Sequence, residues 1–164
     1  MGTKLVQKCA LLCLIATVAA AELLAQQAPA RPAQLPAFVF STPSGTAFTE
    51  ANLKKGMATV VLFFEPDCEH CIKQANWLRE GAAHLSNTQY LWVSWAAAEQ
   101  IAAFGKQYFG GNANHHFVKD AKYAIDKSFG YCTVPTVLVF DKTGKFKKVY
   151  SAETAAEEIA TNLR

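Results

Sequence analysis

The sequence predicts an α/β fold in which helices cover both faces of a mixed central β-sheet. Two observations support this prediction. Apolar runs rich in β-branched and aromatic residues recur along the chain, and segments with helical spacing separate them. Near the C-terminus, two strand-like runs flank a turn and precede one more helix, which adds an antiparallel hairpin to the sheet.

The N-terminal part of the chain is predicted to lie outside the folded domain. Residues 1–25 have the features of a signal peptide, because two lysines precede a thirteen-residue apolar run that small residues follow. The run is shorter than the ~20 residues of a membrane-spanning helix, so we expect cleavage. Residues 26–37, rich in Pro, Ala and Gln, are typical of an extended tether. The domain is therefore expected over 38–164, in a periplasmic or otherwise extracytoplasmic location.

The domain is expected to begin with a strand over 38–42, followed by a turn, a second short strand and a helical turn that Gly56 closes. Residues 58–64, ATVVLFF, form a continuous apolar run, which is typical of a central strand buried on both faces. In residues 68–85, small and apolar side chains recur at helical spacing. A helix is expected there.

The middle of the domain repeats the alternation. Residues 89–95, QYLWVSW, have the composition of a strand. Residues 97–109 follow with an apolar stripe at helical spacing, and residues 120–129 are predicted to form a short helix that ends at a glycine. Between these helices, His115 and His116 are expected in a loop.

The last part of the domain contains the hairpin. Residues 137–140 and 146–150 flank the turn sequence DKTGK. A closing helix is expected over 154–163, beginning with a capping box formed by Thr154 and Glu157.

Length and charge limit the classes of function. A chain of 164 residues is long enough for one domain with a sizeable core. The formal net charge is only +3 and the lysines are scattered, so no nucleic-acid partner and no polybasic membrane surface are expected. We also expect a monomer.

The motif Cys68-Glu69-His70-Cys71 stands where the strand 58–64 passes into the following helix. At the N-terminus of a helix, unpaired backbone N–H groups and the positive end of the helix dipole favour a thiolate. Since the thiolate is the attacking species, Cys68 is the predicted nucleophile of thiol–disulfide exchange. Cys71, one turn further along the same face, is the predicted resolving thiol.

Charges around the motif are expected to tune its reduction potential. A protonated His70 favours the reduced form, whereas Glu65, Asp67 and Glu69 oppose it, so the direction of electron flow stays open. Glu65 is also the nearest carboxylate able to relay a proton to Cys71; the alternative is a solvated charge at the end of a strand.

Two separated motifs, VVLFFEPDCEHC at 60–71 and TVPTVLVFDKTGKF at 133–146, resemble the thioredoxin superfamily. They are most similar to the exported TlpA-like thioredoxins, which share a redoxin (AhpC/TSA-like) scaffold, and the resemblance extends over 38–164. It implies a thioredoxin-like fold with Pro135 as a cis-proline facing the two cysteines. It also implies that the backbone of Val134 pairs with a bound substrate strand.

The resemblance further implies a thiol–disulfide oxidoreductase of cell redox homeostasis. Its partners would be protein disulfides or dithiols and a redox partner protein, such as a membrane electron donor, and no cofactor is expected. Asp67 replaces the tryptophan that usually precedes the first cysteine, and Leu62 stands where thioredoxin has a buried aspartate. Proton transfer to the resolving thiol must therefore differ from that in thioredoxin.

Several alternatives stay open. One alternative is that the C-x-x-C pair is half of a zinc site, but the sequence lacks a second ligand pair with the usual spacing. Another is that the two cysteines form a purely structural disulfide. A copper-binding chaperone would use the two cysteines and His115 or His116, although such relatives space their cysteines by three residues. We expect no resident metal.

A thiol peroxidase is a further alternative. Peroxiredoxins place a threonine and a proline where this sequence has Glu65 and Val61, which speaks against peroxide chemistry.

Cys132 would be a third thiol in the mature chain. Its expected role is that of a small buried residue, and the alternative is a third redox-active thiol.

Overall fold

The computed structural model describes residues 31–130 and 132–163, which belong to one compact unit. The predicted signal peptide and residues 26–30 of the predicted tether lie outside the described residues. The strands are β1 Val39–Ser41, β2 Ala47–Thr49, β3 Ala58–Phe63, β4 Thr88–Ser94, β5 His115–Lys119, β6 Thr136–Phe140 and β7 Phe146–Tyr150. The α-helices are α2 Glu69–Glu80, α3 Ala98–Phe109, α4 Ile125–Phe129 and α5 Ala156–Thr161, with short 3₁₀ turns η1 Glu50–Asn52 and η2 Ala82–His84.

All seven strands join one mixed sheet in the order β2-β1-β5-β4-β3-β6-β7. The strands β3, β4 and β5 run parallel, and the outer strands pair antiparallel with their neighbours. Every residue of β3, β4 and β6 is buried, because helices or loops cover these central strands on both faces. The continuous apolar runs thus became the centre of the sheet, and the predicted fold class is confirmed.

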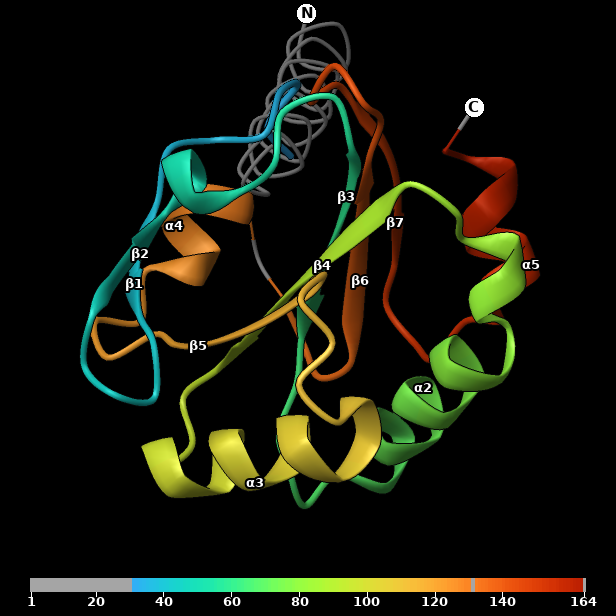
Figure 1. Cartoon of the computed structure of the whole chain (residues 1–164). Coiled ribbons are helices and arrows are strands. Elements are labelled where there is room, and N and C mark those ends of the chain that lie inside the picture. The colour runs from blue at the N-terminus through green and yellow to red at the C-terminus, as the bar shows by residue number, and fades with distance from the viewer. Residues whose placement is uncertain (1–30, 131, 164) are drawn as a thin grey trace, which may run out of the picture. The chain divides into compact units, whose positions relative to one another are not determined.

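The sheet separates two hydrophobic cores. Helices α2, α3 and α5 pack over one face, and their core residues include Cys71, Phe104 and Ile159. Helix α4 and the β1–β2 hairpin enclose the other face, where Phe129 packs with Phe38. Figure 1 shows α2, α3 and α5 on one side of the sheet and α4 on the other. The first long helix after the central strand is therefore held between the sheet and its neighbouring helices.

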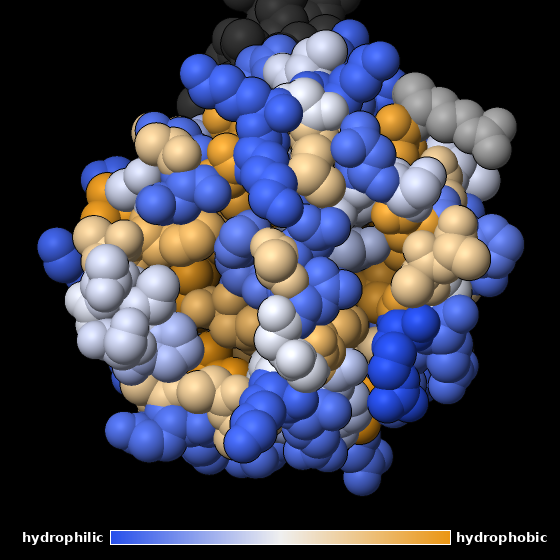
Figure 2. All heavy atoms as spheres, in the orientation of Figure 1, coloured by the Kyte–Doolittle hydropathy of each residue, from blue (hydrophilic) through white to orange (hydrophobic). Residues whose placement is uncertain are grey.

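The outer surface on the side seen in Figure 1 is mixed in character. In Figure 2, hydrophilic residues lie along the rim and down the middle of this face, and apolar residues are visible between them. Within the residues that the structure describes, no helix combines the length and the apolar character needed to cross a membrane.

Gly81 ends α2 and allows α5 to approach it. A Cβ atom at Gly81 would clash with the Cβ of Ala156, at the start of α5. The backbone of Gly81 has φ −90° and ψ 16°, which other residues also adopt. Glycine is therefore required here by the close packing of two elements and not by its backbone conformation.

Strand β5 corrects the expectation that His115 and His116 lie in a loop. Both histidines begin this strand, which pairs parallel with β4 so that His115 lies opposite Tyr90. The strand lacks the apolar run that marks β3 and β4, because two histidines and a lysine occupy three of its five positions. Helix α3 is the crossover connection that two parallel neighbours require.

Two helix boundaries also differ from expectation. The helix expected over 68–85 ends at Glu80, and a 3₁₀ turn replaces its last part. The helix expected over 120–129 begins at Ile125, because the Asp120 carboxylate accepts the N–H of Ile125 (2.8 Å) in a turn before the helix.

The capping box predicted for the last helix is absent. Helix α5 begins after Ala155, and the Thr154 hydroxyl donates to the carbonyl of Ala152 (3.2 Å). The backbone of Thr154 is instead bound to the buried Gln74 side chain. A tertiary contact thus replaced the local cap.

Part of the predicted tether pairs with the domain. Leu35 N–H donates to Gly144 O (2.7 Å), and Phe146 N–H donates to Ala33 O (3.0 Å). The Leu35 side chain is half-buried against the core on the α4 side. Residues 33–35 therefore run along the β6–β7 turn as part of the folded unit.

Candidate functional site

The two cysteines of the C-x-x-C motif lie where β3 passes into α2. Cys68 is the N-cap residue of α2, and its carbonyl accepts the first helical hydrogen bond, from Ile72 N–H (2.9 Å). A tight turn precedes it, in which Cys68 N–H donates to Glu65 O (3.1 Å). The structure thus places Cys68 at the helix N-terminus, where the sequence analysis expected it.

The two thiols have different environments. Cys68 is partly exposed, whereas Cys71 is fully buried in the core beneath α2, and both are free thiols. Burial is the main cause that raises the pKa of Cys71 to about 12. The hydrogen bond of its thiol to Cys68 and the nearby charges of Cys68 and Glu65 raise it further, against a backbone hydrogen bond from Glu65. Cys71 therefore holds its proton while it is in contact with Cys68.

The cis-proline loop lies at the same end of the sheet. Thr136, which begins β6, pairs with Phe63, which ends β3, so the residues before Thr136 meet the β3–α2 turn. The Val134–Pro135 peptide bond is cis. Pro135 is buried, and Val134 is 37% exposed. The exposed Val134 thus lies at the same end of the sheet as the partly exposed Cys68.

Glu65 is half-buried and bound to the end of β4. One carboxylate oxygen accepts the Ser94 hydroxyl (3.2 Å) and the Trp95 N–H (3.3 Å). Its charge acts on Cys71, since it contributes to the raised pKa of that thiol. Glu65 is therefore a positioned carboxylate within electrostatic range of Cys71, and it is not simply a solvated charge.

The other charged residues of the motif divide into two groups. Asp67 and Glu69 are exposed at the start of α2. His70 is also exposed, but its Nδ1 atom lies 3.0 Å from Oε2 of Glu153. Glu153 belongs to the segment between β7 and α5, more than eighty residues further along the chain.

Sequence reasoning missed Glu153 and the residues of α2 that hold its segment. Lys73 Nζ lies 3.0 Å from Glu153 Oε1, and Gln74 binds the backbone of Thr154 through two hydrogen bonds. A buried glutamine in an amphipathic helix was a weak signal that its amide has a tertiary partner. The sequence contains no comparable signal for Glu153.

The histidines of the copper-chaperone alternative lie away from the motif. His115 pairs with Tyr90, which pairs with Val60, three residues before the end of β3. At ~3.3 Å per residue, this is ~10 Å down the sheet from the strand end that leads to Cys68. In the part of the chain that the structure describes, no three His, Cys, Asp or Glu residues are grouped to hold a metal ion.

Cys132 packs in the core on the opposite face from Cys71. It is 5% exposed, and its thiol donates to Gly130 O (3.0 Å). Arg31 Nη1 lies 3.4 Å from its sulfur. Burial raises the pKa of Cys132, although Arg31 opposes that shift. These surroundings match the expected role of a small buried residue.

The aromatic residues Phe64 and Trp92 are also fully buried, so neither lines an exposed substrate groove.

A comparison with protein families finds one match, the AhpC/TSA family, over residues 31–149. No curated protein matches this sequence. The family match covers both the C-x-x-C motif and the cis-proline loop.

Solved structures with a similar fold include three redox proteins or their relatives. A secreted disulfide oxidoreductase from Mycobacterium tuberculosis, described as homologous to Escherichia coli DsbE, has 24% identity and a TM-score of 0.61, covering 77% of this chain and 93% of its own. A thiol:disulfide interchange protein of the thioredoxin family from Chlorobium tepidum has 21% identity and a TM-score of 0.56, covering 83% and 99%.

A peroxiredoxin-like protein from Aquifex aeolicus has 16% identity and a TM-score of 0.64, covering 81% of this chain and 85% of its own. At these identities the three likenesses establish a common thioredoxin-like fold.

Proposed function

The chain belongs to the AhpC/TSA family, and from that premise we propose that it is an extracytoplasmic thiol–disulfide oxidoreductase acting on protein disulfides or dithiols. Cys68 would be the nucleophile and Cys71 the resolving thiol. The observation that supports this most is the contrast between the two sulfurs. One is partly exposed at a helix N-cap, and the other is buried, protonated and hydrogen-bonded to the first.

In the first step, the Cys68 thiolate attacks one sulfur of a substrate disulfide. The substrate S–S bond breaks, a mixed disulfide forms between Cys68 and that sulfur, and the other substrate sulfur leaves as a thiolate. Cys68 occupies the N-cap position of α2, and the start of a helix favours a negative charge such as that of the attacking thiolate. Cys71 cannot compete at this stage, since it is buried and its pKa is raised to about 12.

In the second step, Cys71 loses its proton and attacks Cys68 Sγ. The mixed disulfide breaks, the substrate leaves as a dithiol after protonation, and Cys68–Cys71 becomes a disulfide, so two electrons pass from the protein to the substrate. Formation of the mixed disulfide removes the negative charge of Cys68, one of the causes that raise the pKa of Cys71. Glu65, which is fixed by Ser94 and Trp95, is the proposed proton acceptor. The reverse sequence oxidises a substrate dithiol.

The substrate is proposed to bind through its backbone. Val134 is exposed beside the thiol, and its N–H and carbonyl groups offer main-chain hydrogen bonds to an extended peptide. Pro135, buried behind it, shapes this loop. Recognition of this kind suits protein substrates of differing sequence.

The proposed location outside the cytoplasm is supported by the sequence of the N-terminus. Residues 1–25 would be removed as a signal peptide, which leaves residues 26–37 before the domain at 38–164. One protein of similar fold is itself described as secreted. An oxidising compartment would supply disulfide substrates and a redox partner protein.

The test is turnover of insulin disulfides by the purified protein with dithiothreitol as the reductant. We expect Cys68→Ser to reduce turnover to the rate of the buffer control. Cys71→Ser should instead accumulate a mixed disulfide with the substrate, which non-reducing electrophoresis and mass spectrometry would detect, because the resolving sulfur is missing.

Cys132→Ala is the matched control, since Cys132 packs on the other face of the sheet. It should retain turnover. Full activity of Cys68→Ser, or a mixed disulfide that forms on Cys71 in preference to Cys68, would contradict the proposal.

A further inference from the structure

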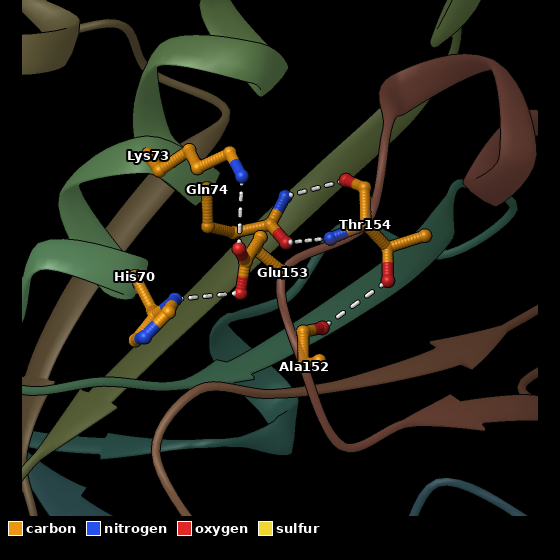
Figure 3. Close-up of polar contacts among 6 residues, drawn as sticks. All are labelled: His70, Lys73, Gln74, Ala152, Glu153 and Thr154. Carbon is orange, nitrogen blue, oxygen red and sulfur yellow. Dashed lines mark hydrogen bonds and ion pairs between the residues drawn. The ribbon is translucent and has the colours of Figure 1, made fainter.

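The segment between β7 and α5 is fastened to the first two turns of α2. The Gln74 side chain is 1% exposed, and its amide nitrogen donates to Thr154 O (3.0 Å) while its amide oxygen accepts Thr154 N–H (2.7 Å). Figure 3 shows both bonds and the neighbouring Glu153 side chain between His70 and Lys73. The buried Gln74 amide makes hydrogen bonds with both its oxygen and its nitrogen, and both go to Thr154. These two bonds fix the position of the segment along α2.

This register brings the Glu153 carboxylate to two basic residues of α2. Its Oε2 lies 3.0 Å from His70 Nδ1, and its Oε1 lies 3.0 Å from Lys73 Nζ. The hydrogen bond from Lys73, followed by one from the Glu153 backbone and one from His70, lowers the pKa of Glu153 to about 2. Glu153 is therefore a carboxylate anion at neutral pH.

The Glu153 anion differs from the other acidic groups near the motif. Its side chain is 15% exposed, whereas Asp67 and Glu69 are exposed residues. Solvent and salt screen an exposed charge more than a half-buried one. Glu153 also binds His70, one of the two residues between the cysteines, so the position of the Glu153 carboxylate is fixed relative to the dithiol.

We propose that Glu153 is a positioning residue that makes the Cys68–Cys71 couple more reducing, by holding the His70 imidazole through Nδ1 and by balancing the positive charge of Lys73, and of His70 when it is protonated, beside the N-terminus of α2. This inference rests on the proposed function of the two cysteines. Positive charge near Cys68 stabilises its thiolate and hence the reduced dithiol, which makes the couple a stronger oxidant. A fixed anion next to those cations opposes this effect.

The experiment measures the equilibrium of the full-length mature protein with glutathione. One protein disulfide and two molecules of reduced glutathione give one protein dithiol and one molecule of oxidised glutathione. Glu153→Gln keeps the size of the side chain and removes its charge, so the equilibrium constant should rise roughly three- to tenfold toward the dithiol, where tenfold corresponds to about 30 mV. The increase should become smaller at 1 M salt.

Glu157→Gln is the matched control. Glu157 also binds a histidine, since its Oε1 lies 3.2 Å from His84 Nε2, but this pair lies beyond the C-terminal end of α2, away from the dithiol. It should leave the equilibrium constant unchanged. A shift of equal size in both variants, or no shift in Glu153→Gln, would overturn the inference.

A second variant keeps the test informative if Glu153→Gln fails to fold. Lys73→Gln removes one of the cations that Glu153 balances, so the equilibrium should move in the opposite direction, toward the disulfide. No movement, or movement toward the dithiol, would overturn the inference.

If the unaltered protein exchanged no disulfide with glutathione, the proposed function itself would fail. Normal exchange with no effect of either variant would refute the role of Glu153 alone.

Discussion

Cys68 and Cys71 are three residues apart, yet their surroundings differ sharply. The N-cap position leaves Cys68 partly exposed with backbone N–H groups beside it, and one helical turn carries Cys71 into the core. Burial first, and the contact with Cys68 second, raise the pKa of Cys71 to about 12. The order of attack in the proposed cycle thus follows from where a helix begins relative to a sheet.

Selective alkylation tests this difference between the thiols. In the reduced protein treated with iodoacetamide at pH 8, we expect the label on Cys68 and not on Cys71. With a pKa of about 12, Cys71 is ionised in roughly one molecule in ten thousand at that pH, and only the thiolate reacts. Peptide mass spectrometry after short labelling times gives the two rates.

Two controls isolate the effect of the fold. In 8 M urea, where both sulfurs meet solvent, the rates should become similar. In Cys68→Ser, the remaining Cys71 should still react slowly, because its burial is the larger cause of the pKa shift. Equal labelling of both cysteines in the folded protein would show that Cys71 is not held protonated.

The functional residues differ in how far sequence could reveal them. Cys68 and Cys71 stand out because strand, turn and helix follow one another locally, and spacing alone places the first at a helix start. Pro135 and Val134 needed a resemblance, since nothing near them points to the cysteines. Glu153 could not be found in either way, because its position depends on where Gln74 binds a segment eighty residues later.

At the scale of elements, burial on both faces decides which strands sequence can predict. The strands β3, β4 and β6 are buried throughout, and each consists mostly of apolar or β-branched residues. Strand β5 has one buried residue, Val118, and its remaining positions are half-buried. Half-buried positions accept histidine and lysine, and the pattern that marks a strand is lost.

Helix ends were predicted less well because tertiary contacts decide them. The sequence predicted that Thr154 and Glu157 cap the last helix, but this helix begins after Ala155. The backbone N–H and carbonyl of Thr154 are instead hydrogen-bonded to the Gln74 side chain. Similarly, α2 ends at Glu80 and is followed by Gly81, whose close contact with Ala156 of α5 could not be read from the local sequence.

The packing of α5 against the end of α2 can be tested at Gly81. We expect Gly81→Ala to lower the free energy of unfolding by about 1–3 kcal/mol, because the new methyl group clashes with the Cβ of Ala156. Urea unfolding followed by circular dichroism measures the change. The single variant Ala156→Gly removes the opposing methyl group, and it is the reference protein in which the effect of Gly81→Ala is measured a second time.

In the double variant, Gly81→Ala should cost much less than in the unaltered protein, since the space left at position 156 accepts the new methyl group. Additive effects of the two substitutions would mean that the clash is relieved elsewhere. A neutral Gly81→Ala would show that the two helices can move apart without loss.

At the scale of the whole molecule, several titratable groups lie in the core on the face of the sheet that α2, α3 and α5 cover. Burial raises the pKa values of Cys71 and Tyr90, so both stay neutral at physiological pH. Burial and the charge of His116 lower the pKa of His115 to about 4. The fold therefore disfavours charge both on Cys71 and in the aromatic cluster around β5, and its stability must depend on pH.

His115 is expected to contribute to the first loss of stability in acid. It accepts a hydrogen bond from Trp92 Nε1 at Nδ1 (3.1 Å) and stacks on Tyr90 and Phe109. Below pH 6.5 the unfolded chain binds a proton at this residue, whereas the folded protein does not until about pH 4. The free energy of unfolding should therefore fall across this window, by on the order of 2 kcal/mol. Glu153, with a pKa lowered from 4.5 to about 2, acts only at still lower pH.

Urea unfolding of the unaltered protein and of His115→Asn at pH 7 and pH 4.5 measures this dependence. Asparagine keeps an acceptor for Trp92 but cannot be protonated, so the loss between the two pH values should shrink. Part of it should persist, because burial also lowers the pKa of His116. The exposed His84, changed to asparagine, should leave the full loss in place. Equal losses in His115→Asn and the unaltered protein would mean that His115 gains its proton in the folded state as readily as in the unfolded chain, and the stacked cluster around β5 would then tolerate a charge.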